Sequence, residues 1–123
     1  MKKVLIVDDE KALRSALKDK LSQDEYDLLE ASSGKECMKT LETESVDLVI
    51  LDIMMPGMSG DEVAKQIYES DKLKSKPAVI ILTNKSDMEL MADIVASAHS
   101  FKYLIKSDST LDKIASTVKE TIS

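Results

Sequence analysis

Two hydrophobic patterns alternate along the chain. Short, mostly apolar runs predict strands over residues 3–7, 27–31, 48–51, 79–82 and 103–105. In the segments between and after them, apolar residues recur every three or four positions and predict helices, which begin at residue 11, near 35, after Ser59, at 86 or 87, and at 111. Ser59 with Glu62 also matches a capping box. A repeated strand-then-helix order predicts an α/β fold.

Parallel strands need crossover connections, so this order predicts a doubly wound, five-stranded parallel sheet with helices on both faces. The flavodoxin-like strand order 2-1-3-4-5 would place the first and third strands side by side. In such sheets, ligands bind beyond the carboxyl ends of the strands, where the strand order reverses. The polar residues expected at that edge are Asp8, Asp9, Asp52, Thr83 and Lys106.

Three converging carboxylates without His or Cys favour a hard divalent cation, Mg²⁺ or Mn²⁺. Such an ion keeps open positions for phosphoryl oxygens, while the Lys106 ammonium and the Thr83 hydroxyl can contact the same group. A carboxylate can itself be the nucleophile and form an aspartyl phosphate. Asp52, at the end of the central strand, is the best placed of the three.

Each of these residues also has a purely structural interpretation. Asp8 and Asp9 could cap the first helix, since acidic residues favour helix N-termini. Lys106 could be a solvated strand end, and Thr83 a strand residue with good β propensity. Only their joint placement at one sheet edge favours a site.

Composition narrows the function classes. A chain of 123 residues fits one domain, 1–123, and no apolar run is long enough to span a bilayer. The single Cys37 agrees with a reducing compartment, so we expect a cytoplasmic protein without membrane contact. A net charge of −6 and the lack of a Lys/Arg-dense segment argue against direct nucleic-acid binding.

The sequence resembles response-regulator receiver domains of two-component signalling, which have a chemotaxis-regulator-like fold, over essentially its whole length. The matching segments are residues 7–10, 51–60, 82–83 and 103–106. Each segment is short, but all four occur in the family's order and at the family's spacing.

The resemblance implies that Asp52 is the phosphoacceptor. It would receive phosphate from the phosphohistidine of a sensor histidine kinase or a phosphotransfer protein. Asp9, Asp52 and the backbone carbonyl of Met54 would bind Mg²⁺ directly, and Asp8 would act mainly through a metal-bound water. Such a domain is not a turnover enzyme, although it catalyses its own phosphorylation and dephosphorylation.

The resemblance also implies a switch. Thr83 and Lys106 would contact the phosphoryl group, Thr83 would shift toward it, and Tyr103 would turn inward. The surface formed by the helix from residue 86, the strand 103–105 and the closing helix would then bind a downstream target, an effector domain or a second copy of the chain. The first helix and the loops beside Asp52 would dock the kinase.

Four positions depart from the family pattern: Ser107, Asn84, His99 and Ser100. Ser107 replaces a proline that usually follows the lysine through a cis peptide, so either the loop changes or the bond is strained. Asn84 stands where a smaller residue is common and could restrict the access of water to phosphorylated Asp52. His99 precedes the last strand and is interpreted as a helix-end residue rather than a ligand.

Other function classes fit less well. A haloacid-dehalogenase-type phosphatase needs a second Asp two residues after its nucleophile, and here that position is Met54. Nucleotide binding is disfavoured because the chain has only three glycines and no phosphate-loop motif. The nearer alternative is a non-phosphorylated, receiver-like protein-interaction module, which the departure at Ser107 keeps open.

Overall fold

The computed structural model describes residues 1–53, 55–84 and 101–122. Its centre is a five-stranded sheet in the order β2-β1-β3-β4-β5, and all neighbouring strands pair in parallel. The strands are β1 (Lys2–Val7), β2 (Tyr26–Ala31), β3 (Leu48–Asp52), β4 (Ala78–Thr83) and β5 (Phe101–Ile105). The predicted fold class and strand order are confirmed.

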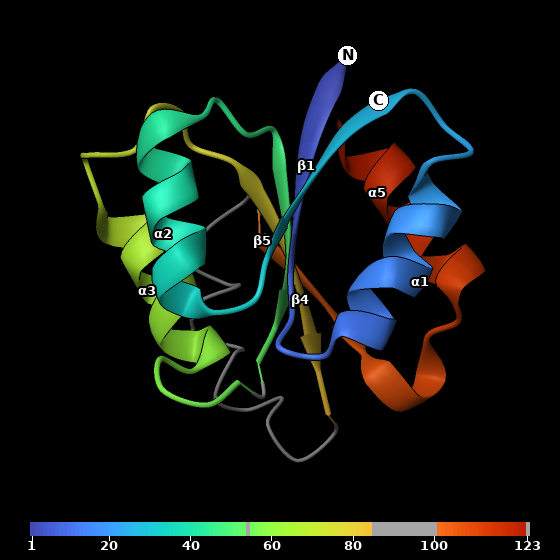
Figure 1. Ribbon diagram of the computed structural model, residues 1–123. Coiled ribbons are helices and arrows are strands. Elements are labelled where there is room, and N and C mark those ends of the chain that lie inside the picture. The colour runs from blue at the N-terminus through green and yellow to red at the C-terminus, as the bar shows by residue number, and fades with distance from the viewer. Residues whose placement is uncertain (54, 85–100, 123) are drawn as a thin grey trace.

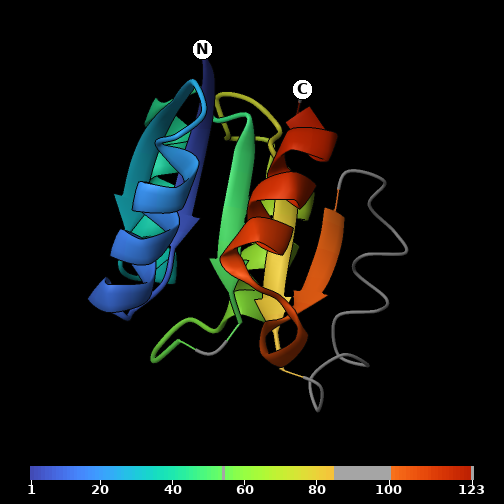
Figure 2. The same ribbon diagram turned by 90° about the vertical axis from the view of Figure 1, so that its right-hand side faces the viewer.

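Helices cover both faces of the sheet (Figures 1 and 2). The helices are α1 (Lys11–Leu21), α2 (Gly34–Thr43), α3 (Gly60–Glu69) and α5 (Leu111–Ile122), with a short 3-10 turn η2 (Lys106–Asp108) after β5. Helices α2 and α3 lie on one face, and α1 and α5 lie on the other. The helix expected from residue 86 or 87, and His99, lie outside the described residues.

The sheet separates two hydrophobic cores because successive side chains of a strand point to opposite faces. In β3, Val49 and Leu51 pack toward α2 and α3, whereas Leu48 and Ile50 pack toward α1 and α5. Every residue of β3 is buried. Each such aliphatic side chain contributes about 1.5–3 kcal/mol relative to an exposed one, so the central strand is held firmly from both sides.

Cys37 lies in the core under α2 and is completely buried. Burial raises the pKa of its thiol to about 12, so the side chain stays protonated at neutral pH. Cys37 therefore packs as a small hydrophobic residue of the core.

Two local predictions were wrong. Strand β5 begins at Phe101 instead of residue 103, because the Phe101 ring is buried and its backbone pairs with Val79 of β4. Ser59 is the N-cap residue of α3, but its hydroxyl accepts no helix amide and instead donates a hydrogen bond to the Asp61 carboxylate. The capping box with Glu62 is therefore absent.

In the described part of the chain, every helix is too short or too polar to cross a membrane.

Candidate functional site

The three predicted carboxylates lie together at the carboxyl edge of the sheet, the lower edge in Figure 1. Asp8 and Asp9 follow β1, and Asp52 ends β3. One oxygen from each lies within 4.8 Å of the others. Asp8 and Asp52 are each 1% exposed, whereas Asp9 is exposed to solvent.

Strand register brings these side chains together. Val7 of β1 pairs with Leu51 of β3. The residues that follow them, Asp8 and Asp52, therefore lie at the same level of the sheet edge. The ladder continues just beyond the strands, since the Asp8 amide donates to the Ala31 carbonyl at 3.1 Å. Likewise the Ile53 amide donates to the Leu82 carbonyl at 3.0 Å. The backbone on both sides of the cluster is therefore fixed by the sheet.

Lys106, in the turn η2 directly after β5, completes the cluster. Its Nζ lies 3.0 Å from Asp52 Oδ2 and donates a hydrogen bond to it. Partial burial alone would lower the pKa of Lys106, but the hydrogen bond to Asp52 and the negative charges of Asp52, Asp8 and Glu10 outweigh it and raise that pKa. The ammonium therefore stays charged beside the buried carboxylate.

Asp8 has one satisfied and one unsatisfied oxygen. Oδ1 accepts a hydrogen bond from the Glu10 amide at 2.8 Å, while the buried Oδ2 has no partner within the described residues. Burial raises the pKa of Asp8 from 3.8 to about 6; the charge of Asp52 adds to this, and the Glu10 amide and Lys106 oppose it. A buried carboxylate oxygen without a hydrogen-bond partner, on a residue grouped with two further carboxylates, fits a hard divalent cation.

The capping interpretation holds only in part. Helix α1 begins at Lys11 with Glu10 as its N-cap, and Glu10 makes no side-chain cap hydrogen bond. Asp8 binds the amide of Glu10 itself, so it orders the loop before the helix. One carboxylate oxygen thus has a structural role, and the other has no hydrogen-bond partner among the described residues.

Thr83 and Tyr103 lie on neighbouring strands near this edge. Thr83 ends β4 and is completely buried, and its hydroxyl donates to the Asn84 carbonyl at 3.0 Å. Tyr103 pairs with Ile81 across β4 and β5, and its side chain is 36% exposed. Met54, expected to offer a backbone carbonyl to a metal, lies outside the described residues.

Sequence reasoning missed Arg14. Its Nη1 donates to the Asp8 carbonyl at 2.7 Å, and its Nε donates to Glu30 Oε1 at 3.3 Å, so it ties the loop after β1 to strand β2. Lys18 also pairs with Glu30, at 3.2 Å. Arg14 occupies a polar position of an amphipathic helix, where hydrophobic periodicity carries no signal for a specific contact.

The chain at Ser107 differs from the family pattern in its loop. The described residues contain no cis peptide bond, and Lys106 and Ser107 enter the turn η2. The junction therefore contains no strained cis bond.

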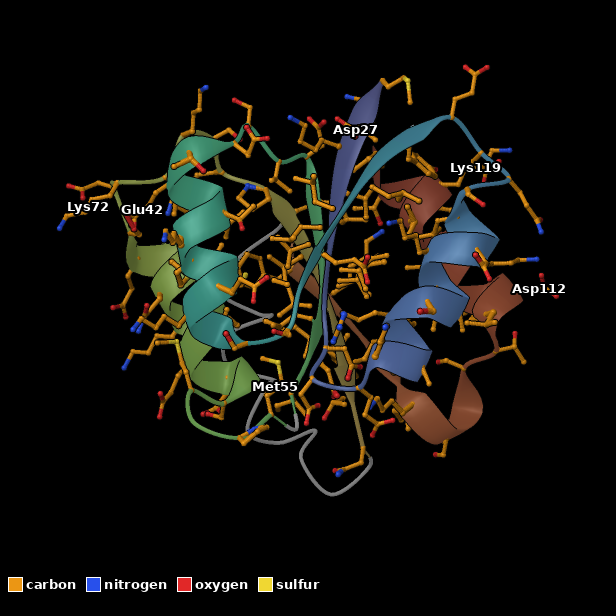
Figure 3. All side chains as sticks on the ribbon, viewed as in Figure 1. Asp27, Glu42, Met55, Lys72, Asp112 and Lys119 are labelled. Atoms are coloured by element: carbon orange, nitrogen blue, oxygen red, sulfur yellow. The ribbon has the colours of Figure 1, made fainter. Side chains whose placement is uncertain are left out.

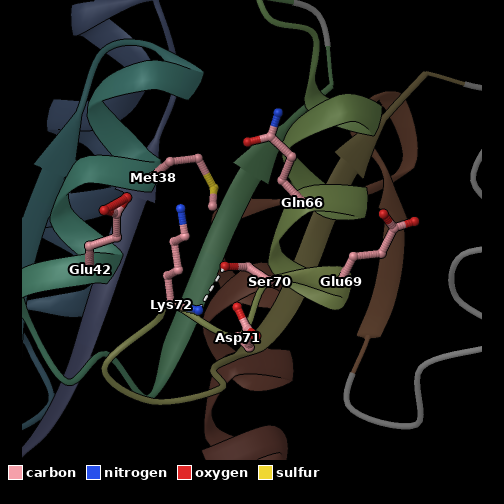
Figure 4. A pocket seen from close by; sticks show the side chains of 7 residues that line it. All are labelled: Met38, Glu42, Gln66, Glu69, Ser70, Asp71 and Lys72. Atoms are coloured by element: carbon pink, nitrogen blue, oxygen red, sulfur yellow. Dashed lines mark hydrogen bonds between the residues drawn. The ribbon is translucent and has the colours of Figure 1, made fainter.

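A separate surface hollow of about 360 Å³ lies between α2 and α3 (Figure 4). Its side chains include Met38, Glu42 and Lys72, and the Lys72 amide donates to Ser70 Oγ at 3.1 Å. In Figure 3, Glu42 and Lys72 lie at the left margin, above and away from Met55, which follows β3 closely in the chain. The hollow is therefore remote from the aspartate cluster.

The chain belongs to the response regulator receiver domain family, whose model matches residues 4–119. Among curated proteins, it is 40% identical over 86 residues to the alkaline phosphatase synthesis transcriptional regulatory protein PhoP of Bacillus subtilis (strain 168). That match covers 70% of this chain and 35% of PhoP, so the chain spans about a third of that relative.

Solved structures of similar proteins support the same family assignment. The response regulator TrrA of Thermotoga maritima, in complex with Mg²⁺-BeF, is 35% identical with a TM-score of 0.82, and the match covers 98% of this chain and 99% of that one. A chain in the structure of the histidine kinase ThkA in complex with TrrA matches at 37% identity and a TM-score of 0.79. That match covers 100% of this chain and 100% of the matched chain. Receiver domains of this family are signalling modules, not turnover enzymes.

The raised pKa of Asp8 predicts that this residue destabilises the metal-free protein to an extent that depends on pH. Folding raises this pKa from 3.8 to about 6, so the contribution of Asp8 to the free energy of unfolding falls as pH rises from about 4 to about 6 and is level above that. Asp8→Asn should remove this fall and stabilise the protein at pH 7 by about 1–3 kcal/mol. Urea unfolding of both proteins in EDTA, from pH 4 to 7, measures it. A difference that stays constant over this range would contradict the prediction.

Proposed function

We propose that this chain is a phosphoacceptor receiver domain in which Asp52 accepts a phosphoryl group from a histidine kinase or phosphotransfer protein. The observation that carries the proposal is the buried Asp52 carboxylate, paired with Lys106 at 3.0 Å and grouped with Asp8 and Asp9. An Asp52 oxygen forms the new bond to phosphorus while the bond from phosphorus to the donor imidazole nitrogen breaks. The imidazole leaves with the bond's electron pair.

The donor set fits Mg²⁺, with Mn²⁺ as the alternative ion. Asp9 and Asp52 would hold the ion directly, Asp8 through a water molecule, and the Met54 carbonyl would be a further ligand. When bound, the ion neutralises phosphoryl oxygens during transfer. Asp8 supports this assignment because one of its oxygens has no hydrogen-bond partner among the described residues, and TrrA, a similar protein, is known in complex with Mg²⁺-BeF.

Lys106 and Thr83 would bind the phosphoryl group. The Lys106 ammonium already lies against the nucleophile, so it can follow the negative charge from Asp52 to the new phosphoryl oxygens. The Thr83 hydroxyl would exchange the Asn84 carbonyl for a phosphoryl oxygen. The partly exposed Tyr103 ring would turn inward as Thr83 moves.

The partners we propose follow from this chemistry. A histidine kinase or phosphotransfer protein docks at α1 and the loops beside Asp52; TrrA offers a precedent, since it is known in complex with the kinase ThkA. The surface of β5, α5 and the helix expected from residue 86 signals to a target, an effector domain or a second copy. The buried, free Cys37 agrees with a cytoplasmic location.

The competing proposal is a receiver-like module that binds partners without phosphorylation. The observation in its favour is the changed junction at Lys106 and Ser107, where the chain forms η2. Phosphorylation of the isolated chain separates the two proposals.

Incubation with acetyl phosphate and Mg²⁺ should add one phosphoryl group to the wild type and none to Asp52→Asn, because the amide is not a nucleophile. Intact-mass spectrometry measures the addition. Asp19→Asn, an exposed carboxylate of α1, is the control and should be labelled like the wild type. An unlabelled wild type would favour the interaction module.

Asp9→Ala should weaken Mg²⁺ binding by at least about tenfold, because it removes a direct ligand. Titration calorimetry of the unphosphorylated protein measures the affinity, with Asp19→Ala as the control for loss of one surface charge. Equal affinities for Asp9→Ala and the wild type would remove Asp9 from the metal site.

Asn84→Ala should lose its phosphate several-fold faster than the wild type, because the smaller side chain gives water more access to phosphorylated Asp52. The substitution keeps the Asn84 carbonyl, so the hydrogen bond from Thr83 is unaffected. The decay of the phosphorylated mass after donor removal measures the rate. Identical decay in the two proteins would sink the idea.

A further inference from the structure

Helix α3 begins in direct contact with the backbone of the nucleophile. The Gly60 amide donates to the Ile53 carbonyl at 2.9 Å. A Cβ atom built on Gly60 would lie 2.3 Å from Ile53 Cα, 2.6 Å from the Asp52 carbonyl oxygen and 3.0 Å from the Ile53 amide nitrogen. Real Cβ atoms essentially never come nearer than 3.0 Å, so only a glycine fits here without displacement.

The other glycines of the chain show why this contact is special. A Cβ on Gly34 would also be too close to its neighbours, but these are side-chain atoms: Val63 Cγ2 at 2.5 Å and Met58 at 3.1 Å. Gly57 has a φ of +78° and open space around it. At Gly60 alone among them, the obstructing atoms belong to the backbone of Asp52 and the residue after it.

The backbone of Asp52 and Ile53 cannot move without disturbing its contacts with β4 and the core. Asp52 pairs with Leu82 in β4, and the Ile53 amide donates to the Leu82 carbonyl at 3.0 Å. The Ile53 side chain is itself buried in the core. A push from α3 is therefore opposed by β4, and any remaining shift changes where the Asp52 carboxylate lies relative to Lys106.

We propose that Gly60 is a positioning residue for the nucleophile: by lacking a side chain, it lets the start of α3 support the Asp52–Ile53 backbone and hold the Asp52 carboxylate in reach of Lys106. The proposal rests on the proposed function of Asp52 as phosphoacceptor. It extends the site to a residue that touches neither phosphate nor metal.

The test compares Gly60→Ala with Gly34→Ala. Both substitutions introduce a methyl group at the first residue of a helix and should lower the midpoint of thermal unfolding. Only Gly60→Ala should also slow phosphorylation, by about ten- to hundredfold, when both proteins are folded and Mg²⁺ and acetyl phosphate are saturating. A merely structural role would change the unfolding midpoint and leave this rate unchanged.

The outcomes separate the two proposals. If the wild type is not phosphorylated, the proposed function fails and this inference with it. If the wild type reacts and folded Gly60→Ala reacts equally fast, or if Gly34→Ala slows as much, the positioning role alone is overturned.

Hydrogen exchange in the wild type decides the matter if Gly60→Ala does not fold. Mg²⁺ with beryllium fluoride should slow exchange of the Gly60 amide, which donates to Ile53, because occupancy of the site fixes the Asp52 backbone. The comparison is the Cys37 amide in the first turn of α2, which donates to the Ser33 carbonyl at 3.0 Å and should be unaffected. Equal behaviour of the two amides would overturn the proposal.

Discussion

The contact between Lys106 and Asp52 is the interaction on which the site depends. It joins β5 to β3 across the end of β4, which lies between them in the sheet. A polar side chain as buried as that of Asp52 needs a hydrogen-bond partner, and the Lys106 ammonium supplies one. The register of three parallel strands therefore determines whether Lys106 lies within reach of Asp52, and Thr83 lies at the end of the strand between them.

The same edge carries more negative charge than one lysine balances. Asp8 is buried with an open oxygen, and the raised pKa shows that ionising it in the folded chain has a cost. Asp9, exposed to solvent, adds a further carboxylate. The fold tolerates this arrangement because two hydrophobic cores hold β1 and β3 in place. The excess charge is what a divalent cation would relieve, so the property that lowers metal-free stability also favours metal binding.

Much of this arrangement could be predicted from the sequence, since strands buried on both faces read as continuous apolar runs and parallel strands end at one edge. That reasoning brings Asp52 and Lys106 together although they lie far apart in the chain. It could not find Arg14 or Gly60, because a hydrogen bond to a main-chain carbonyl and a close approach between backbones leave no periodic pattern. It also misjudged Ser59, whose hydroxyl had a competing carboxylate two residues away.

The junction after β5 is where the sequence departs most from the family, and the structure limits what that departure can mean. Ser107 lies in the 3-10 turn η2, and the described residues contain no cis peptide bond. The Lys106 side chain nevertheless reaches Asp52. The position of the ammonium is set mainly by β5, which pairs with β4 up to Ile105, directly before the lysine. A change in the following loop can therefore leave the ion pair between Lys106 and Asp52 in place.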